Sequence, residues 1–170
     1  MKQTPVLSIQ NLSVAFKSNT GLNEVLHGIS YDLFPNEILG IVGESGSGKS
    51  VASLAIMGLL PPKNSVISSG EITFKNEDIL QYSQTQLESL RGQKIAMIFQ
   101  EPMSALNPSM CCGKQVEEIL LQHSSIAQKE AKNEVMRLFN DVKIPTPDET
   151  FNKYPHEISG GQQQRVMIAM

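Results

Sequence analysis

A glycine-rich segment that follows a short apolar run is the feature that most limits how this chain can fold. The segment reads Gly43-Glu44-Ser45-Gly46-Ser47-Gly48-Lys49-Ser50, so a glycine is followed, after four residues, by Gly-Lys-Ser. The apolar run before it, residues 38–42, predicts a central strand buried on both faces of a parallel sheet. Residues 49–60 are apolar on nearly every side and predict a buried helix. Strand, glycine-rich loop and helix in this order are the context expected of a phosphate-binding loop, or P-loop.

Each residue type in this loop suits the binding of phosphate groups. Glycines permit backbone conformations that other residues disfavour, and they let N–H groups approach the phosphates. The following helix directs the positive end of its dipole at the same place. Lys49 would contact the β- and γ-phosphates, and the Ser50 hydroxyl suits Mg²⁺. We therefore predict that ATP and Mg²⁺ bind at Gly43, Glu44, Ser45, Gly46, Ser47, Gly48, Lys49, Ser50 and Val51. The alternative is a glycine-rich turn before an ordinary helix.

The composition is that of a globular protein of one domain of ordinary size. Hydrophobic residues make up 40% of the 170 residues and charged residues 18%, enough apolar surface for a core. The net charge of -3 and the aromatic content of 5% disfavour nucleic acid as a partner. The two cysteines, Cys111 and Cys112, are adjacent and do not form a disulfide framework. No apolar run is long enough for a secretory signal or a membrane-spanning helix.

Hydrophobic periodicity predicts an α/β part followed by a helical part. Strands are expected at residues 6–16, 24–34, 38–42, 71–74 and 95–99, and a polar helix at residues 83–90. Beyond these, two apolar stripes have helical spacing: Val116, Ile119 and Leu120, then Ala127, Ala131, Val135, Leu138, Phe139 and Val142. The break falls between residues 102 and 113, which predicts a division into residues 1–102 and residues 103–170.

A second motif stands near the end of the chain, at Ile158-Ser159-Gly160-Gly161-Gln162-Gln163-Gln164-Arg165. It resembles the signature sequence of ABC-type ATPases, Leu-Ser-Gly-Gly-Gln, with isoleucine in place of leucine. Taken alone, it could be a plain helix start with a serine N-cap. The resemblance implies that it acts in trans, closing over the γ-phosphate at the P-loop of a second ATPase subunit in a head-to-tail dimer. The residues with that implied role are Ser159, Gly160, Gly161 and Gln162.

The same resemblance assigns roles to two more residues. Gln100, at the end of the apolar run 95–99, fits the Q-loop of this family. It is similar to the residue that, together with Ser50, reaches Mg²⁺, and that links the site to the membrane subunits. Phe16 lies where the family places an aromatic residue that stacks on adenine. A core phenylalanine at the end of a strand explains Phe16 nearly as well.

Two further segments resemble one subfamily, the ATP-binding subunits of peptide and nickel importers. They are residues 99–108, Phe-Gln-Glu-Pro-Met-Ser-Ala-Leu-Asn-Pro, and residues 154–157, Tyr-Pro-His-Glu. The resemblance implies a second ABC ATPase subunit, two transmembrane permease subunits and, indirectly, an extracytoplasmic solute-binding protein as partners. It implies a peripheral location at the cytoplasmic face of a prokaryotic inner membrane. The transported solute, and whether the two ATPase subunits are identical, stay open.

The chain departs from the family pattern in the region of the Walker B strand. The family has four apolar residues and Asp-Glu after the signature, where the Asp orders Mg²⁺ and the Glu polarises water. Here the one Asp-Glu, Asp148-Glu149, follows two prolines and precedes the signature, so a central strand is not expected there. The last residues, 166–170, resemble a helix cut short. We expect a fold that is incomplete at the C-terminus and marginally stable.

These observations leave three functions open. The first is that the chain is the ATPase of a peptide-type importer. The second is that it is a nucleotide-binding module that hydrolyses nothing. The third is a soluble ABC protein without a membrane partner, which usually carries a second ATPase domain or a long coiled-coil insertion. ATPase activity is therefore uncertain from the sequence.

Overall fold

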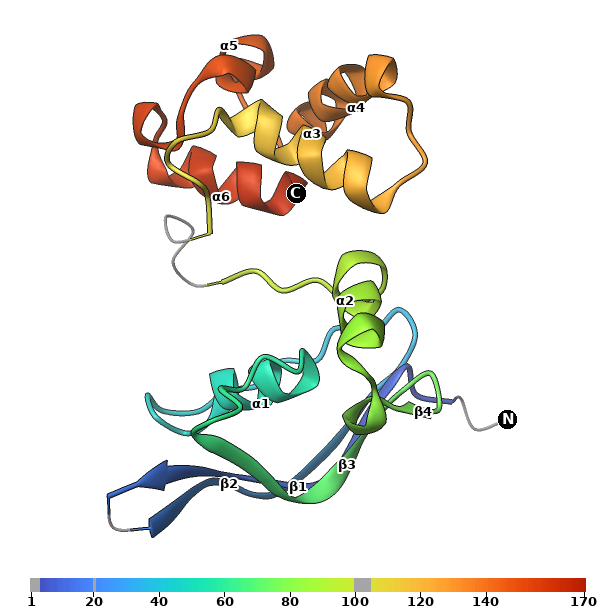
Figure 1. Ribbon diagram of the computed structural model, residues 1–170, viewed down its shortest axis with the longest axis vertical. Helices are drawn as coiled ribbons and strands as arrows, with labels where there is room; N and C mark the ends of the chain where they lie inside the picture. Colours follow the sequence, from blue (N-terminus) through green and yellow to red (C-terminus); the bar gives the residue numbers. More distant parts are fainter. Residues whose placement is uncertain (1–3, 20, 100–104) are drawn as a thin grey trace. The chain divides into compact units, whose positions relative to one another are not determined.

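The computed structural model describes residues 4–19, 21–99 and 105–170, and Gly92 by its backbone alone. These residues form two compact units, residues 1–95 and residues 96–170 (Figure 1). Each unit has a hydrophobic core of its own and is described by itself. The boundary between the two units lies after residue 95, near the division predicted after residue 102 but not at it. The division after residue 102 remains a prediction.

The first unit is built on an antiparallel sheet. Its strands are β1 (Leu7–Ser18), β2 (Gly21–Leu33), β3 (Ser65–Phe74) and β4 (Glu77–Asp78), in the order β2-β1-β3-β4. The central strand β1 pairs along most of its length with β2 on one side and β3 on the other. The predicted strands at residues 6–16, 24–34 and 71–74 are therefore confirmed, and β3 begins earlier than expected.

One face of this sheet carries the core of the first unit. Ile9, Leu12 and Val14 of β1 and Ile72 of β3 are fully buried there. Helix α1 (Lys49–Ile56) packs Ala52 and Ala55 into the same core. The short turn η1 (Ile79–Gln81) and helix α2 (Gln84–Gln93) complete the unit. A capping box between Ser83 and Gln86 starts α2, in agreement with the predicted helix at residues 83–90.

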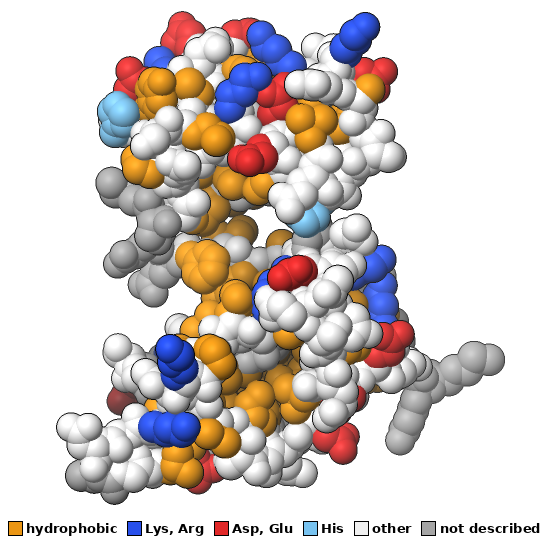
Figure 2. All heavy atoms as spheres, viewed as in Figure 1, with side chains coloured by type: hydrophobic (Ala, Val, Ile, Leu, Met, Phe, Trp, Pro, Cys, Tyr) orange, Lys and Arg blue, Asp and Glu red, His pale blue; other side chains and the backbone are white. Residues whose placement is uncertain are grey.

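The two apolar runs predicted as buried strands are not strands. Residues 38–42 and 95–99 are irregular, and Ile38 and Val42 are 98% and 97% exposed. A strand needs a neighbour that takes its backbone hydrogen bonds, and the described sheet includes neither run. Hydrophobic side chains accordingly show on the surface of the molecule in Figure 2. The parallel sheet expected around residues 38–42 is thus wrong for the described residues.

Helix α1 is also shorter and less buried than expected. It ends at Ile56, not at residue 60, and Met57 is its C-cap. Only Ala52 and Ala55 within the helix are buried, while Val51 and Leu54 are half-buried. The small buried residues let one side of the helix approach the sheet closely. The other side packs only in part within the described residues of this unit.

The second unit is helical. It contains α3 (Cys112–His123), α4 (Gln128–Asp141), α5 (Pro147–Asn152), the turn η3 (Pro155–Glu157) and α6 (Gly160–Ala169). The predicted apolar stripes lie on α3 and α4, and their centres Val116, Val135 and Phe139 are fully buried. Gly113 packs directly against the ring of Phe151, because a Cβ atom there would lie 2.1 Å from Phe151 Cδ2.

Asp148 and Glu149 lie in the first turn of α5, with Pro147 at the start of the helix. Glu149 Oε2 pairs with Lys153 Nζ at 3.2 Å. As expected, this Asp-Glu pair is not on a strand. Both cysteines are free thiols.

Candidate phosphate-binding site

Residues 43–47 are exposed, and the loop leads through the buried Gly48 directly into α1. Gly46 and Gly48 have positive φ angles of 85° and 88°, a region that strongly favours glycine. Gly48 is also buried against β2, because a Cβ atom on it would lie 2.5 Å from Leu26 Cδ2. A Cβ atom on Gly43 would lie 2.6 Å from Ser47 Oγ. The glycines therefore set the shape of the loop in two ways, by conformation and by close approach.

The ammonium group of Lys49 sits over this loop. Its Nζ donates to the carbonyl oxygens of Gly43 and Glu44 at 2.7 Å each, and to Ser47 Oγ at 3.1 Å. These partners match the three donors of an ammonium group. All three acceptors are neutral, so an anion placed beside Nζ would gain a stronger, charge-assisted hydrogen bond. The loop thus holds a positive charge in place at its centre.

The N-terminus of α1 adds a second attraction for an anion. Its N-cap is Gly48, which has no side chain to accept from the first N–H groups, and no acidic residue lies in the first turn. Free N–H groups and the helix dipole favour negative charge at such an end. Ser50 is exposed in the same turn. The donors around the loop therefore fit a phosphate group, and the Ser50 hydroxyl is available as an oxygen ligand for Mg²⁺.

Phe16 lies near one end of β1 and is half-buried against the core of the first unit. It pairs with Asn23 on β2 and with Ser65 on β3. Two residues away, Val14 pairs with Leu26, the residue against which Gly48 packs. This places Phe16 on the part of the sheet that borders the loop. Stacking of its ring on adenine stays a prediction.

The second motif forms the start of α6. Ser159 is the N-cap: its Oγ accepts from Gln162 N at 3.3 Å, and its N–H donates to Gln162 Oε1 at 3.0 Å. This reciprocal pair is a capping box, so the helix-start interpretation is confirmed. Gly160 and Gly161 are exposed, and a Cβ atom on either would meet nothing within 4 Å. No described residue of their own unit requires glycine at these two positions.

Further contacts hold this helix start within the second unit. Arg165 Nη1 donates to the carbonyl oxygens of Val142 and Lys143, at 2.6 and 3.0 Å, and so caps the end of α4. The buried Gln163 donates through Nε2 to Pro155 O at 2.7 Å. The motif is thus fixed from both sides while its two glycines face outward. Gln100, predicted as a Q-loop residue and Mg²⁺ ligand, lies outside the described residues.

Sequence reasoning missed two features of the loop. The cage around Lys49 Nζ consists mainly of backbone carbonyls, which leave no trace in residue identity. The contact of Gly48 with Leu26 joins residues far apart in the chain, and only a known fold would have revealed it. The N-cap role of Ser159, by contrast, was an interpretation that the sequence offered, and the structure adds Gln162 as its partner in a capping box.

Comparison with known proteins decides the family. The model of the family described as ABC transporter matches residues 26–170. The chain belongs to the ABC transporter family. The match begins in β2, beside the P-loop, and includes both motifs. Membership of this ABC family implies nucleotide binding, and the predicted fold class, an α/β P-loop core of ABC type with an antiparallel β subdomain and a helical subdomain, is confirmed.

Similar sequences carry related names. The dipeptide transport ATP-binding protein DppD of Bacillus subtilis is 47% identical over 97% of this chain and 49% of its own length. The oligopeptide transport ATP-binding protein OppD of the same organism is 43% identical over 100% of this chain and 48% of its own. The probable D,D-dipeptide transport ATP-binding protein DdpD of Escherichia coli is 43% identical over 98% and 51%. The chain therefore spans about half the length of these relatives.

Solved structures of ABC cassettes have the same fold. A dimeric ATP-binding cassette in a post-hydrolysis state, bound to ADP and Pi, superposes with a TM-score of 0.82 at 25% identity, over 96% of this chain and 67% of that one. A component of an ABC transporter complex of Clostridium perfringens gives a TM-score of 0.76 at 28% identity, over 98% and 61%. Among the described residues of this ABC chain, no helix is long and apolar enough to cross a membrane.

Proposed function

We propose that this chain is the nucleotide-binding part of an ABC importer subunit that couples ATP to the uptake of peptides or related small solutes. The observation that carries the proposal is the Lys49 cage at an exposed, uncapped helix N-terminus. It presents a fixed cation and free N–H groups to a phosphate chain. The names of the peptide transport relatives support the class of solute. Nickel, which the subfamily resemblance also covers, is the alternative solute.

In this proposal the P-loop residues 43–51 hold the phosphates of ATP, and Ser50 and Gln100 hold Mg²⁺. Bound Mg·ATP would supply the phosphoanhydride bond whose hydrolysis to ADP and phosphate drives transport. Lys49 provides the positive charge, and the glycines keep side chains out of the way of the phosphates. Phe16 offers an aromatic face for the adenine ring.

The signature motif is proposed to act on the nucleotide of a second ATPase subunit, in a head-to-tail dimer. The two outward-facing glycines support this, because their own unit leaves them unobstructed. The dimeric cassette among the structural neighbours supports it as well. Two permease subunits, and indirectly a solute-binding protein, complete the proposed complex at the cytoplasmic face of the inner membrane.

A second candidate function is nucleotide binding by this chain without hydrolysis. It is favoured by the position of the one Asp-Glu pair, which lies on α5 with Glu149 engaged by Lys153. In the family pattern the catalytic Glu follows a strand, whereas Glu149 lies on a helix. Phosphate release from Mg·ATP that disappears in Lys49→Ala would exclude this second candidate.

Calorimetric titration with Mg·ATP tests the proposed function. Lys49→Ala should weaken binding at least about tenfold, because a charge-assisted hydrogen bond to phosphate contributes roughly 1.5–3 kcal/mol. Lys63→Ala, which removes an exposed lysine outside the loop, is the matched control and should bind as the parent chain does. Equal affinity in the parent and in Lys49→Ala would show that the loop does not bind the nucleotide.

A further inference from the structure

Asn23 of β2 stands directly beside Phe16, the residue proposed to offer its ring to adenine. The two residues pair across β1 and β2. Directly opposed residues of an antiparallel pair share one face of the sheet, with Cβ atoms about 4.5–5.5 Å apart. The adjacent pair, Ala15 with Glu24, points to the opposite face. The pairing register therefore places the Asn23 side chain next to the Phe16 ring.

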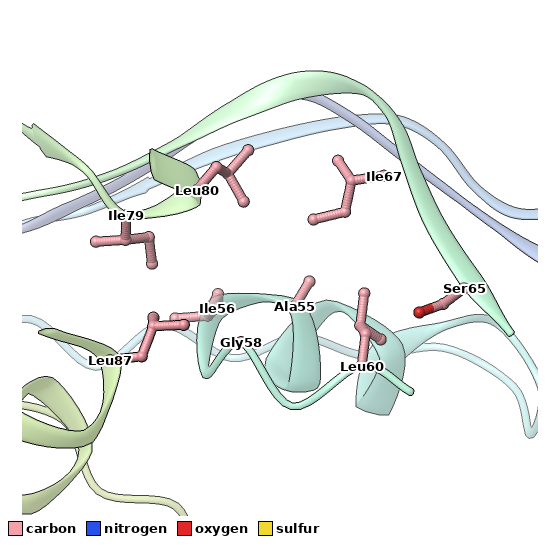
Figure 3. A pocket seen from close by; sticks show the side chains of 9 residues that line it. All are labelled: Ala55, Ile56, Gly58, Leu60, Ser65, Ile67, Ile79, Leu80 and Leu87. Carbon is pink, nitrogen blue, oxygen red and sulfur yellow. The ribbon is translucent and has the colours of Figure 1, made fainter. Parts of the chain in front are cut away.

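The face that carries these two side chains is the one toward α1. On its other side, Phe16 pairs with Ser65 of β3. Figure 3 shows Ser65 and Ile67 of β3 on the side of the strand where Ala55 of α1 lies, and all three line one pocket. Phe16 also packs against the core that contains Ala55. Phe16 and Asn23 therefore lie on the side of the sheet from which the P-loop helix starts.

The P-loop meets this face a short way along the sheet. Gly48 packs against Leu26, and Leu26 pairs with Val14 of β1. Val14 precedes Phe16 by two residues, a distance of about 7 Å along a strand. A nucleotide held by its phosphates at the loop thus has Phe16 and Asn23 within reach of its base.

The amide of Asn23 is available to a ligand. Asn23 is exposed, and its side chain makes no hydrogen bond to any residue that the structure describes. On the other side of Phe16, the hydroxyl of Ser65 donates its one proton to Pro61 O at 2.7 Å. An asparagine amide carries two N–H donors and an acceptor oxygen. Asn23 is therefore the cross-strand neighbour of Phe16 that offers a base both a donor and an acceptor.

We propose that Asn23 selects adenine over guanine at this site. The inference rests on the proposed function, in which the phosphates lie at residues 43–51 and the base lies on Phe16. An asparagine amide pairs with adenine through two hydrogen bonds, accepting from the N6 amino group and donating to N7. Guanine presents acceptors, O6 and N7, at both of these positions. The oxygen of the Asn23 amide would then face an acceptor, and one of the two hydrogen bonds would be lost.

Calorimetric titration with Mg·ATP and with Mg·GTP tests the role of Asn23. The parent chain should bind Mg·ATP at least about fivefold more tightly than Mg·GTP, the low end of what a bidentate pair with a base provides. In Asn23→Leu this ratio should fall below about twofold, because the amide is gone. Glu24→Leu is the matched control: it places the same side chain at the adjacent residue, on the opposite face of the sheet, and should keep the ratio of the parent chain.

The outcomes separate this inference from the proposed function. If the parent chain binds neither nucleotide, the proposed function fails and the role of Asn23 fails with it. If the parent chain binds both nucleotides equally, or if Asn23→Leu keeps the preference for ATP, only the role of Asn23 is overturned. Magnesium tripolyphosphate, which has no base, should bind equally to the parent chain and to Asn23→Leu; weaker binding by the variant would show a disturbed loop and would also overturn that role. If Asn23→Leu does not fold by circular dichroism, Asn23→Ala carries the same test.

Discussion

Lys49 Nζ lies 2.7 Å from the carbonyl oxygen of Gly43 and thereby joins the two ends of the P-loop. The same ammonium group also holds Glu44 O and Ser47 Oγ. The ammonium group of Lys49 therefore closes the loop through its own hydrogen bonds. A site organised in this way loses less conformational entropy on binding.

Lys49→Met should loosen the loop in the absence of nucleotide. The amide of Ser47 donates to Glu44 O at 3.2 Å, so its hydrogen exchange reports whether the loop stays closed. We expect exchange about tenfold faster in Lys49→Met, because charge-assisted hydrogen bonds worth roughly 1.5 kcal/mol or more are lost. Lys63→Met is the control. Unchanged exchange at Ser47 would mean that the lysine does not organise the loop.

Gly48→Ala should destabilise the first unit more than Gly46→Ala. Both positions have positive φ, which costs a non-glycine residue about 1 kcal/mol. Only at Gly48 would the added Cβ also meet Leu26, at 2.5 Å, whereas at Gly46 it meets nothing within 4 Å. We expect an additional loss of about 1–3 kcal/mol for Gly48→Ala.

Urea denaturation of the two variants measures this difference directly. If both variants lose the same free energy of unfolding, Leu26 moves aside for the added Cβ atom at Gly48 without destabilising the unit.

The antiparallel strands at residues 6–16, 24–34 and 71–74 could be predicted from the sequence because apolar residues recur in each at short spacing. Ile9 and Leu12 are both fully buried on β1 although they stand three residues apart, because the pairing register shifts between them. The apolar runs at residues 38–42 and 95–99 could not be placed in this way. A run of apolar residues predicts a strand only if a neighbour pairs with it, and pairing is not a property of the run itself.

The candidate site likewise has features that the sequence could predict and features that it could not. The glycines, Lys49 and the N-cap role of Ser159 were predictable, because motif spacing and local hydrogen bonding define them. Two other features depend on tertiary structure. They are the packing of Gly48 against Leu26 and the hydrogen bond from Arg165 to the carbonyl oxygen of Val142. No spacing within the sequence indicates either.

Cys112 should make the second unit less stable at alkaline pH. Burial first of all, then the charge of Cys111, raise the pKa of its thiol from an ordinary 9.0 to about 11, although a backbone hydrogen bond lowers it in part. The folded chain therefore holds this proton more tightly than the unfolded chain. The resulting contribution to stability is complete below pH 9.0 and is lost as the pH rises to about 11.

Unfolding of the parent chain and of Cys112→Ala, followed between pH 8 and about 11, tests this linkage. The stability difference between the two should shrink as the pH rises, while Cys111→Ala loses only the part of the pH dependence that the charge of Cys111 supplies. Burial raises the pKa of Tyr31 too, and taking the difference between variants removes that contribution. A difference independent of pH would contradict the assignment to Cys112.

Ser159 and Gly160 should separate the structural role of the signature motif from its proposed role in a dimer. Ser159→Ala removes the capping box and should lower the free energy of unfolding of the second unit by about 1 kcal/mol. Gly160→Ala meets no neighbour within 4 Å and should be neutral, or stabilising by up to about 1 kcal/mol, because alanine is the better helix former. Urea denaturation measures the stability of Gly160→Ala, and size-exclusion chromatography with Mg·ATP measures its dimer formation. If the variant is as stable as the parent chain but forms no dimer, Gly160 is needed for contact with the second subunit. A normal dimer in that variant would instead leave the motif as a helix start and nothing more.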